Sequence, residues 1–127
     1  IREGYQVLVE TNGSRDISVL PDGCIRIVDV KCPSSNESQS FFPKNLIHLG
    51  PNDEIKFVIG SRADYEFART AIPKLPAVVT SERVHLSPVH GRVEPAQLAK
   101  WIIHDGLNAR LTMQMHKIIW HPEQRGV

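Results

Sequence analysis

The sequence predicts an α/β fold with about five mostly parallel strands and two main helices. Short runs of β-branched residues alternate along the chain with two segments whose apolar residues recur at helical spacing. Turns that contain glycine or proline separate these segments. Strands that alternate with helices are typical of a parallel sheet with right-handed crossovers. The length of 127 residues fits a single domain, and we expect residues 1–127 to form one.

Apolar runs rich in valine and isoleucine predict the strands. Four of them cover residues 5–11, 25–31, 54–59 and 84–89. A fifth strand is predicted over residues 109–119, because Leu111, Met113 and Met115 alternate there with polar residues. Residues 1–4 end in a glycine and resemble the last turn of a helix, so we also expect protein upstream of them.

Two helices are predicted from their start and stop signals. Ser61 and Asp64 have the spacing of a capping box, and Pro73 ends the helix that they open. The second helix begins with proline at its first position, Pro95, and Gly106 closes it. Both helices carry an apolar stripe that a sheet can bury.

Composition limits the possible partners. The net charge is +1, so nothing indicates general attraction to nucleic acid or to a membrane surface. Apolar residues make up 41% of the chain, yet they form no run near the roughly 20 residues that cross a bilayer. Two cysteines are too few for a disulfide framework, and they indicate a reduced, cytoplasmic context.

Polar residues interrupt all five predicted strands, mostly near their C-terminal ends. A covered parallel sheet is normally almost continuously apolar, and buried charges must be paired or bound to a ligand. The pattern therefore predicts a polar cup where the strands end. An alternative is that Asp29, Lys31 and Lys56 simply pair with one another. If the cup exists, one cavity is lined by Thr11, Lys31, Ser87, Gln114 and His116.

Glycine, histidine and cysteine give weaker signals. Gly13 follows the first strand and leaves room for a ligand at the main chain, although an ordinary Asn-Gly turn is the alternative. His116 and Lys117 are the best functional pair, with a solvated strand end as the alternative. Cys24 and Cys32 predict buried thiols. None of the six histidines stands with cysteines at the spacing of a zinc site, so no metal ligand is predicted.

Several motifs, taken in their order along the chain, carry a family resemblance. They read VETNG at 9–13, DVKCPSS at 29–35, DEIKFVI at 53–59, LSPVHG at 86–91, QxHKxxW at 114–120 and RGV at 125–127. Over most of its length the chain resembles the 7-carboxy-7-deazaguanine synthases, which are radical S-adenosylmethionine enzymes. The resemblance implies the C-terminal part of a partial (β/α) radical-SAM-type barrel.

The family resemblance also implies a reaction and a set of site residues. Such enzymes rearrange 6-carboxytetrahydropterin into 7-carboxy-7-deazaguanine with loss of ammonia, using a 4Fe-4S cluster, S-adenosylmethionine and Mg²⁺. By similarity, Thr11 and the terminal carboxylate of Val127 contact the pterin, and we expect Gln114, His116 and Lys117 to join them. The residues implied for S-adenosylmethionine are Gly13, Asp29, Val30, Lys31, Ser87, Pro88, Val89 and His90.

The chain departs from the family where the cluster binds. The Cys-x-x-x-Cys-x-x-Cys motif, the neighbouring Mg²⁺-binding threonine and the Gly-Gly-Glu strand are all absent from the sequence. We therefore expect a C-terminal portion that is inactive alone and that forms a homodimer across its first strand. Two alternatives stay open: a relative of the activases of glycyl-radical enzymes, and a non-enzymatic module that binds a pterin or nucleotide.

Overall fold

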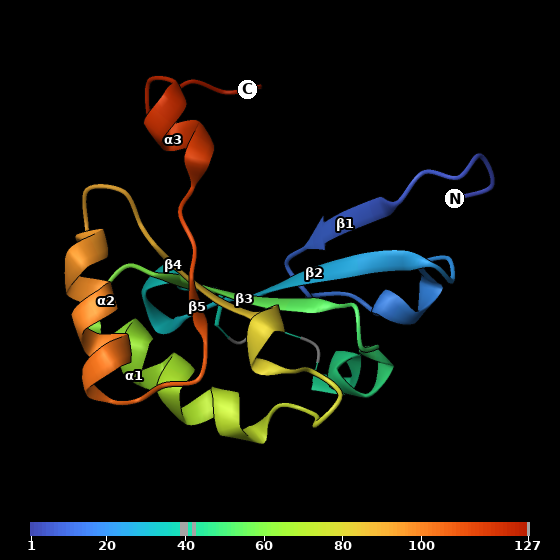
Figure 1. The fold of residues 1–127 in the computed structure, drawn as a ribbon, viewed down its shortest axis with the longest axis horizontal. Coiled ribbons are helices and arrows are strands. Elements are labelled where there is room, and N and C mark those ends of the chain that lie inside the picture. Colours follow the sequence, from blue (N-terminus) through green and yellow to red (C-terminus); the bar gives the residue numbers. More distant parts are fainter. Residues whose placement is uncertain (39–40, 42, 127) are drawn as a thin grey trace.

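Parallel strands form one sheet in the order β1-β2-β3-β4-β5 (Figure 1). The computed structural model describes residues 1–38, 41 and 43–126, so Val127 lies outside the described residues. The predicted α/β class and the parallel arrangement are confirmed. The strands are β1 (Val7–Thr11), β2 (Cys24–Val30), β3 (Glu54–Ile59), β4 (Val84–Pro88) and β5 (Arg110–Leu111).

Short helices connect the strands. The α-helices are α1 (Arg62–Ala71), α2 (Pro95–His104) and α3 (Met115–Ile119). Tighter 3-10 turns form η1 (Ile17–Val19), η2 (Pro33–Ser35), η3 (Pro43–His48), η4 (Ile72–Lys74) and η5 (Ser81–Arg83). Within the described ranges, none of these helices has the length and apolar character needed to span a bilayer.

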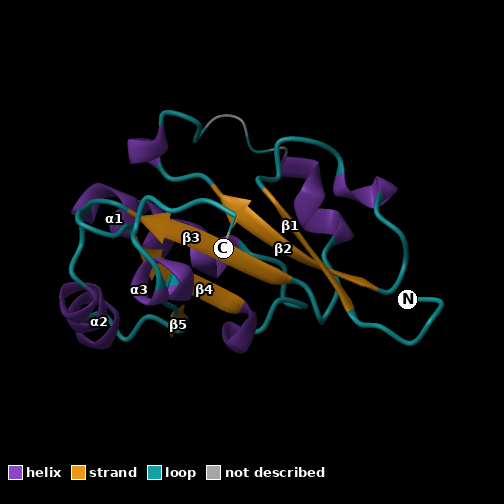
Figure 2. Cartoon of the chain, turned by 90° about the horizontal axis from the view of Figure 1, so that it is seen from above, coloured by secondary structure: helices purple, strands orange, loops and turns teal. Residues whose placement is uncertain are grey.

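The two faces of the sheet differ. Helices α1 and α2 lie against one face, whereas α3 stands off the other face and projects over the strand ends (Figures 1 and 2). On the covered face, alternate strand residues such as Val28, Ile55 and Leu86 are fully buried with Leu98 of α2. We call the opposite side, which carries Asp29 and its alternate neighbours, the open face.

The two main helices begin as predicted. The Ser61 side chain accepts a hydrogen bond of 3.2 Å from the backbone N–H of Asp64, so it caps α1. Pro95 is the first residue of α2. The Asp64 carboxylate, however, accepts from the backbone N–H of Gly60 at 2.9 Å, so the capping box is formed only in part.

The fifth predicted strand is wrong over most of its length. Strand β5 ends at Leu111, and the last bond toward β4 runs from the N–H of Thr112 to the carbonyl of Leu86 at 2.9 Å. Beyond it, Met115, Ile118 and Ile119 have helical spacing and form α3. Alternating and helical patterns overlap in this segment, and the pairing with β4 ends too early to hold the strand.

At residues 1–4, where the last turn of a helix is predicted, the structure has a turn that is not part of a helix. These residues form a single turn in which the N–H of Gly4 donates to the carbonyl of Ile1 at 3.1 Å. Gly4 has a φ of +83°, a value that closes an isolated turn as readily as it ends a helix.

We propose that the outer edge of β1 mediates self-association of the chain. Strand β1 is the first in the sheet order and pairs only with β2 within the described residues. Leu8 is 52% exposed and Tyr5 72% exposed beside this edge. An open apolar edge invites pairing with a second chain.

Light scattering should show that the chain is a dimer, and Leu8→Lys should shift the equilibrium toward the monomer. A stable wild-type monomer at high concentration would contradict the proposed association.

Candidate functional site

Two adjoining hollows of about 160 and 280 Å³ lie at the C-terminal ends of the strands. They share Asp29 and Lys56, which are register neighbours on β2 and β3. We call them together the strand-end cup. Its lining residues are Glu10, Thr11, Asn12, Ile27, Asp29, Lys31, Cys32, Ser34, Ser35, Lys56, Val58, Val89, Arg92 and Gln114.

Charged side chains in the cup are only partly paired. Lys31 Nζ lies 2.6 Å from Asp29 Oδ2, so structural pairing, the alternative from the sequence, is realised for these two residues. Lys56 Nζ lies 3.9 Å from Glu10 Oε1 on the neighbouring strand. Asp29 Oδ1 is buried and accepts no hydrogen bond from the described residues. Such an acceptor is a natural place for a ligand's donor group.

The cup unites fewer of the predicted residues than expected. Lys31 and Gln114 line the same hollow, as predicted. Thr11 borders the adjoining hollow, but it is in register with Val28, so its side chain belongs to the covered face. Its Oγ1 accepts from the N–H of Gly13 at 3.2 Å. For Thr11, the predicted single cavity is therefore wrong, because the register places its side chain on the other face.

Ser87 and His116 also fall outside the cup. Ser87 is 1% exposed on β4, and its Oγ has no hydrogen-bond partner among the described residues. His116 lies exposed on α3 rather than on a strand, so the prediction of one cavity is wrong for both. Lys117 does line a third hollow of about 280 Å³, together with His90 and Gln114. Gln114 therefore borders both the cup and this third hollow.

The remaining residues implied for S-adenosylmethionine lie in different places: some line the cup or the third hollow, and one is buried on the covered face. Val89 lines the cup, and Pro88 lines the third hollow. Val30 is buried in the core on the covered face at 8% exposure, so only its main chain is available at the strand end. The roles of these residues stay predictions.

Gly13 is required by packing as well as by backbone geometry. Its φ is +65°, and an added Cβ would lie 2.8 Å from the Phe41 ring and 2.9 Å from Val28. Its N–H donates to Thr11 and its carbonyl accepts from Asn45 Nδ2 at 2.9 Å. Both main-chain groups are thus already used inside the protein. Contact between Gly13 and a cofactor stays a prediction.

Two buried polar side chains hold the loops around the cup, and sequence reasoning missed both roles. Asn45 is 1% exposed, donates to the carbonyls of Gly13 and Arg15, and accepts from the N–H of Ile17. Asp64 is fully buried and accepts from Ser34 and Gly60. Burial would raise the pKa of Asp64, but these donors and Ser61 hold it below its ordinary value.

The thiols of this chain do not fit a 4Fe-4S cluster. Cys24 begins β2 and Cys32 lies two residues beyond its end, so the two are on the order of 25 Å apart at the usual rise of a strand. Burial, with Asp64 and Asp29 nearby, raises the pKa of the Cys32 thiol to about 12. Within the part of the chain that is described, no three His, Cys, Asp or Glu residues gather as metal ligands.

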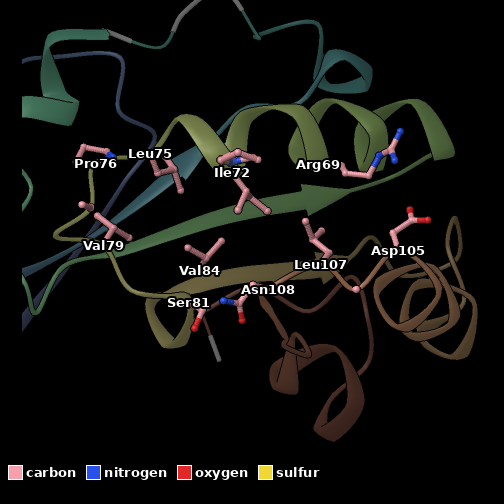
Figure 3. Close-up of a pocket in the computed structure, with 13 residues that line it drawn as sticks. Arg69, Ile72, Leu75, Pro76, Val79, Ser81, Val84, Asp105, Leu107 and Asn108 are labelled. Carbon is pink, nitrogen blue, oxygen red and sulfur yellow. The ribbon is translucent and has the colours of Figure 1, made fainter.

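A cavity larger than either hollow of the cup lies on the covered face, away from the strand ends. It measures about 500 Å³ and lies among η4, the start of β4 and the loop after α2 (Figure 3). Its walls are mostly apolar, with Arg69 and Asp105 at one end. Arg69 is paired with Glu66 at 2.6 Å, and Asp105 accepts from Tyr65 at 2.9 Å. We therefore place the candidate site in the cup.

Comparison with curated proteins gives one consistent family. The 7-carboxy-7-deazaguanine synthase of Koribacter versatilis is 44% identical to this chain, covering 100% of the chain and 62% of its own length. The proteins of the same name from Chlorobaculum tepidum and Methanospirillum hungatei are 34% and 35% identical, covering 95% and 96% of the chain. No protein-family model and no solved structure matches.

The curated relatives are longer than this chain. It spans 62%, 56% and 50% of the length of these three proteins. The resemblance that the sequence motifs predicted is confirmed by these comparisons.

Substitution of Gly13 separates packing from backbone strain. Gly91 has a φ of +75° with nothing within 4 Å of an added Cβ, so Gly91→Ala should cost only the backbone strain, about 1–2 kcal/mol. Gly13→Ala adds the clash with Phe41 and Val28, about 1–3 kcal/mol more. Urea unfolding measures both. Equal destabilisation by the two variants would show that the space beside Gly13 is not filled.

Proposed function

The chain belongs to the 7-carboxy-7-deazaguanine synthase family, and we propose that it forms the substrate- and cofactor-binding C-terminal part of such a synthase. The complete enzyme would convert 6-carboxytetrahydropterin to 7-carboxy-7-deazaguanine with loss of ammonia, in the cytoplasm. Radical S-adenosylmethionine chemistry is part of this proposal. The pterin is its small-molecule partner.

The cup is the observation that carries the proposal. It collects residues from β1, β2 and β3 and from the segments after β4 and β5, and one of them is Asp29, whose buried Oδ1 lacks a partner among the described residues. Ligands of parallel α/β proteins bind at this edge of the sheet. A polar cofactor with hydroxyl and amino donors suits the acceptor on Asp29, whereas a purely apolar ligand does not.

In the proposed site, residues at and after the strand ends bind either the cofactor or the pterin. Asp29 would accept a hydrogen bond from S-adenosylmethionine through Oδ1, while Lys31 holds the other oxygen at 2.6 Å and keeps the carboxylate oriented. The Ser87–His90 segment and the main chain of Val30 would complete the cofactor contacts. A contact with Gly13 would be a van der Waals one, because its N–H and carbonyl are already hydrogen-bonded to Thr11 and Asn45. Gln114 and Lys117, which line the third hollow, would contact the pterin together with His116 and Val127. Thr11 would contact it through its main chain, because its side chain belongs to the covered face. When bound, S-adenosylmethionine supplies the means of hydrogen-atom removal from the pterin.

The 4Fe-4S cluster and Mg²⁺ require residues that this chain does not offer. Two separated thiols cannot replace the three cysteines that such a cluster needs here. We propose that another part of the complete enzyme binds the cluster and Mg²⁺. This chain then orients the cofactor and the pterin and excludes water from them.

Asp29→Asn tests the proposed cofactor contact in the complete enzyme. The amide keeps the shape but loses the charge and one acceptor, so the KM for S-adenosylmethionine should rise about tenfold or more. Formation of 7-carboxy-7-deazaguanine is the readout, and Asp22→Asn on the exposed turn before β2 is the control. An unchanged KM in Asp29→Asn would refute the contact, and absence of product with the wild type would refute the reaction.

The 127-residue chain alone should not cleave S-adenosylmethionine. After anaerobic treatment with iron and sulfide, we expect no stoichiometric cluster in the absorbance spectrum, because Cys24 and Cys32 lie too far apart. Deoxyadenosine release after reduction is the second readout. Stoichiometric iron together with reductive cleavage would overturn the assignment of the cluster to another part of the enzyme.

A further inference from the structure

The Asp64 carboxylate joins three elements at the C-terminal edge of the sheet. Its Oδ1 accepts from the N–H of Ser34 at 2.9 Å, and its Oδ2 accepts from Ser34 Oγ at 2.5 Å and from the N–H of Gly60 at 2.9 Å. Ser34 follows β2, Gly60 follows β3, and Asp64 lies in the first turn of α1. The side chain is fully buried, so solvent cannot replace these donors.

The segment held by Asp64 is part of the cup. Lys31, Cys32, Ser34 and Ser35 all line its larger hollow, whereas Asp64 itself does not. The segment lies so close to the end of β3 that a Cβ at Gly60 would be 3.0 Å from Ser34 Oγ. Ser35 Oγ donates to the carbonyl of Cys32 at 2.6 Å, which stiffens the turn further. The position of this wall of the cup therefore depends on Asp64.

We propose that Asp64 is a positioning residue that sets cofactor affinity by holding residues 31–35 in their ligand-binding arrangement. This inference rests on the proposed function, because it takes the cup as the S-adenosylmethionine site. Asp64 acts through Ser34 and touches no ligand itself. The capping spacing of Ser61 and Asp64 is compatible with a purely helical role, so the test must separate positioning from stability.

Asp53 provides a matched control at the opposite edge of the sheet. It is 3% exposed and accepts from the N–H groups of Arg26 and Gly50 at 2.7 and 2.8 Å, with the Arg26 guanidinium at 3.2 Å. Like Asp64, it is a buried carboxylate that accepts three hydrogen bonds. It precedes β3, whereas Asp64 follows it, and it lines neither hollow of the cup.

The first experiment measures the dissociation constant of S-adenosylmethionine in the complete enzyme. Asp64→Asn places an NH₂ group opposite a backbone N–H, so one donor loses its acceptor and the segment shifts. We expect at least tenfold weaker binding, against less than twofold for Asp53→Asn, although both variants unfold at lower urea concentration. Binding within twofold of wild type in a folded Asp64→Asn enzyme would overturn the proposal.

A milder variant covers the case in which Asp64→Asn does not fold. Ser34→Ala removes only the Oγ donor and retains the backbone bond to Asp64. We expect about threefold weaker binding of S-adenosylmethionine in the complete enzyme. Unchanged affinity in Ser34→Ala would then count against positioning through Ser34.

The second experiment uses the two thiols of this chain as local probes. Cys32 is 2% exposed inside the held segment, and Cys24 begins β2 two residues before Arg26, near Asp53. Asp64→Asn should speed iodoacetamide labelling of Cys32 at least tenfold, as mass spectrometry reports it, with little change at Cys24. Asp53→Asn should do the reverse. Because the Asp64 charge itself raises the pKa of the Cys32 thiol, Ser34→Ala, which keeps that charge, should also speed the labelling of Cys32. Equal labelling of Cys32 in both variants would refute the proposal.

The two experiments separate the inference from the proposed function. If wild-type complete enzyme binds no S-adenosylmethionine, the assignment of the cup to that cofactor is wrong. The labelling rates of Cys32 still decide whether Asp64 holds the segment. If the wild type binds the cofactor, and Asp64→Asn changes neither the affinity for it nor the labelling rate of Cys32, only the positioning role of Asp64 is wrong.

Discussion

The parallel alignment of the strands is the constraint on which the rest of this structure depends. Because all the pairs from β1 to β5 run in one direction, each strand delivers its last residues to the same edge. The covered face is closed by α1 and α2, so polar residues at the strand ends gather on the open face (Figure 1). The cup results from topology rather than from any single motif.

A cup built from strand ends needs loops that do not move. Asn45 and Asp64 meet this need on the turns after β1 and β2, respectively. Each buries a polar side chain, which is unfavourable unless its hydrogen bonds are made in full. Asp64 uses both oxygens and Asn45 uses both its amide and its carbonyl. Among the described residues, Asp29 is then the carboxylate that has a buried oxygen without a hydrogen-bond partner.

Much of the fold could be predicted because its signals are local. Strand β3 and the starts of α1 and α2 follow from β-branched runs, the cap at Ser61 and the proline at Pro95. The existence of the last strand was predicted but its end was not, because residues 109–119 fit both an alternating and a helical pattern.

The candidate site was predicted only in part, because a short sequence segment determines neither the register between strands nor the contacts between residues far apart in the chain. Lys31 and Gln114 were placed together correctly. The register of β1 turns the Thr11 side chain to the covered face, and no pattern in the sequence reveals that pairing. The bond between Asp64 and Ser34 joins residues 30 positions apart, so the capping spacing alone gave no sign of it.

The central claim is that the strand-end cup receives S-adenosylmethionine in a 7-carboxy-7-deazaguanine synthase. A crystal structure of the complete enzyme with S-adenosylmethionine and the pterin bound tests it most directly. The account predicts density for the cofactor against Asp29 and the Lys31–Ser35 wall, with Asp64 still bonded to Ser34. Cofactor density elsewhere, for example in the cavity beside Arg69 on the covered face, would contradict it.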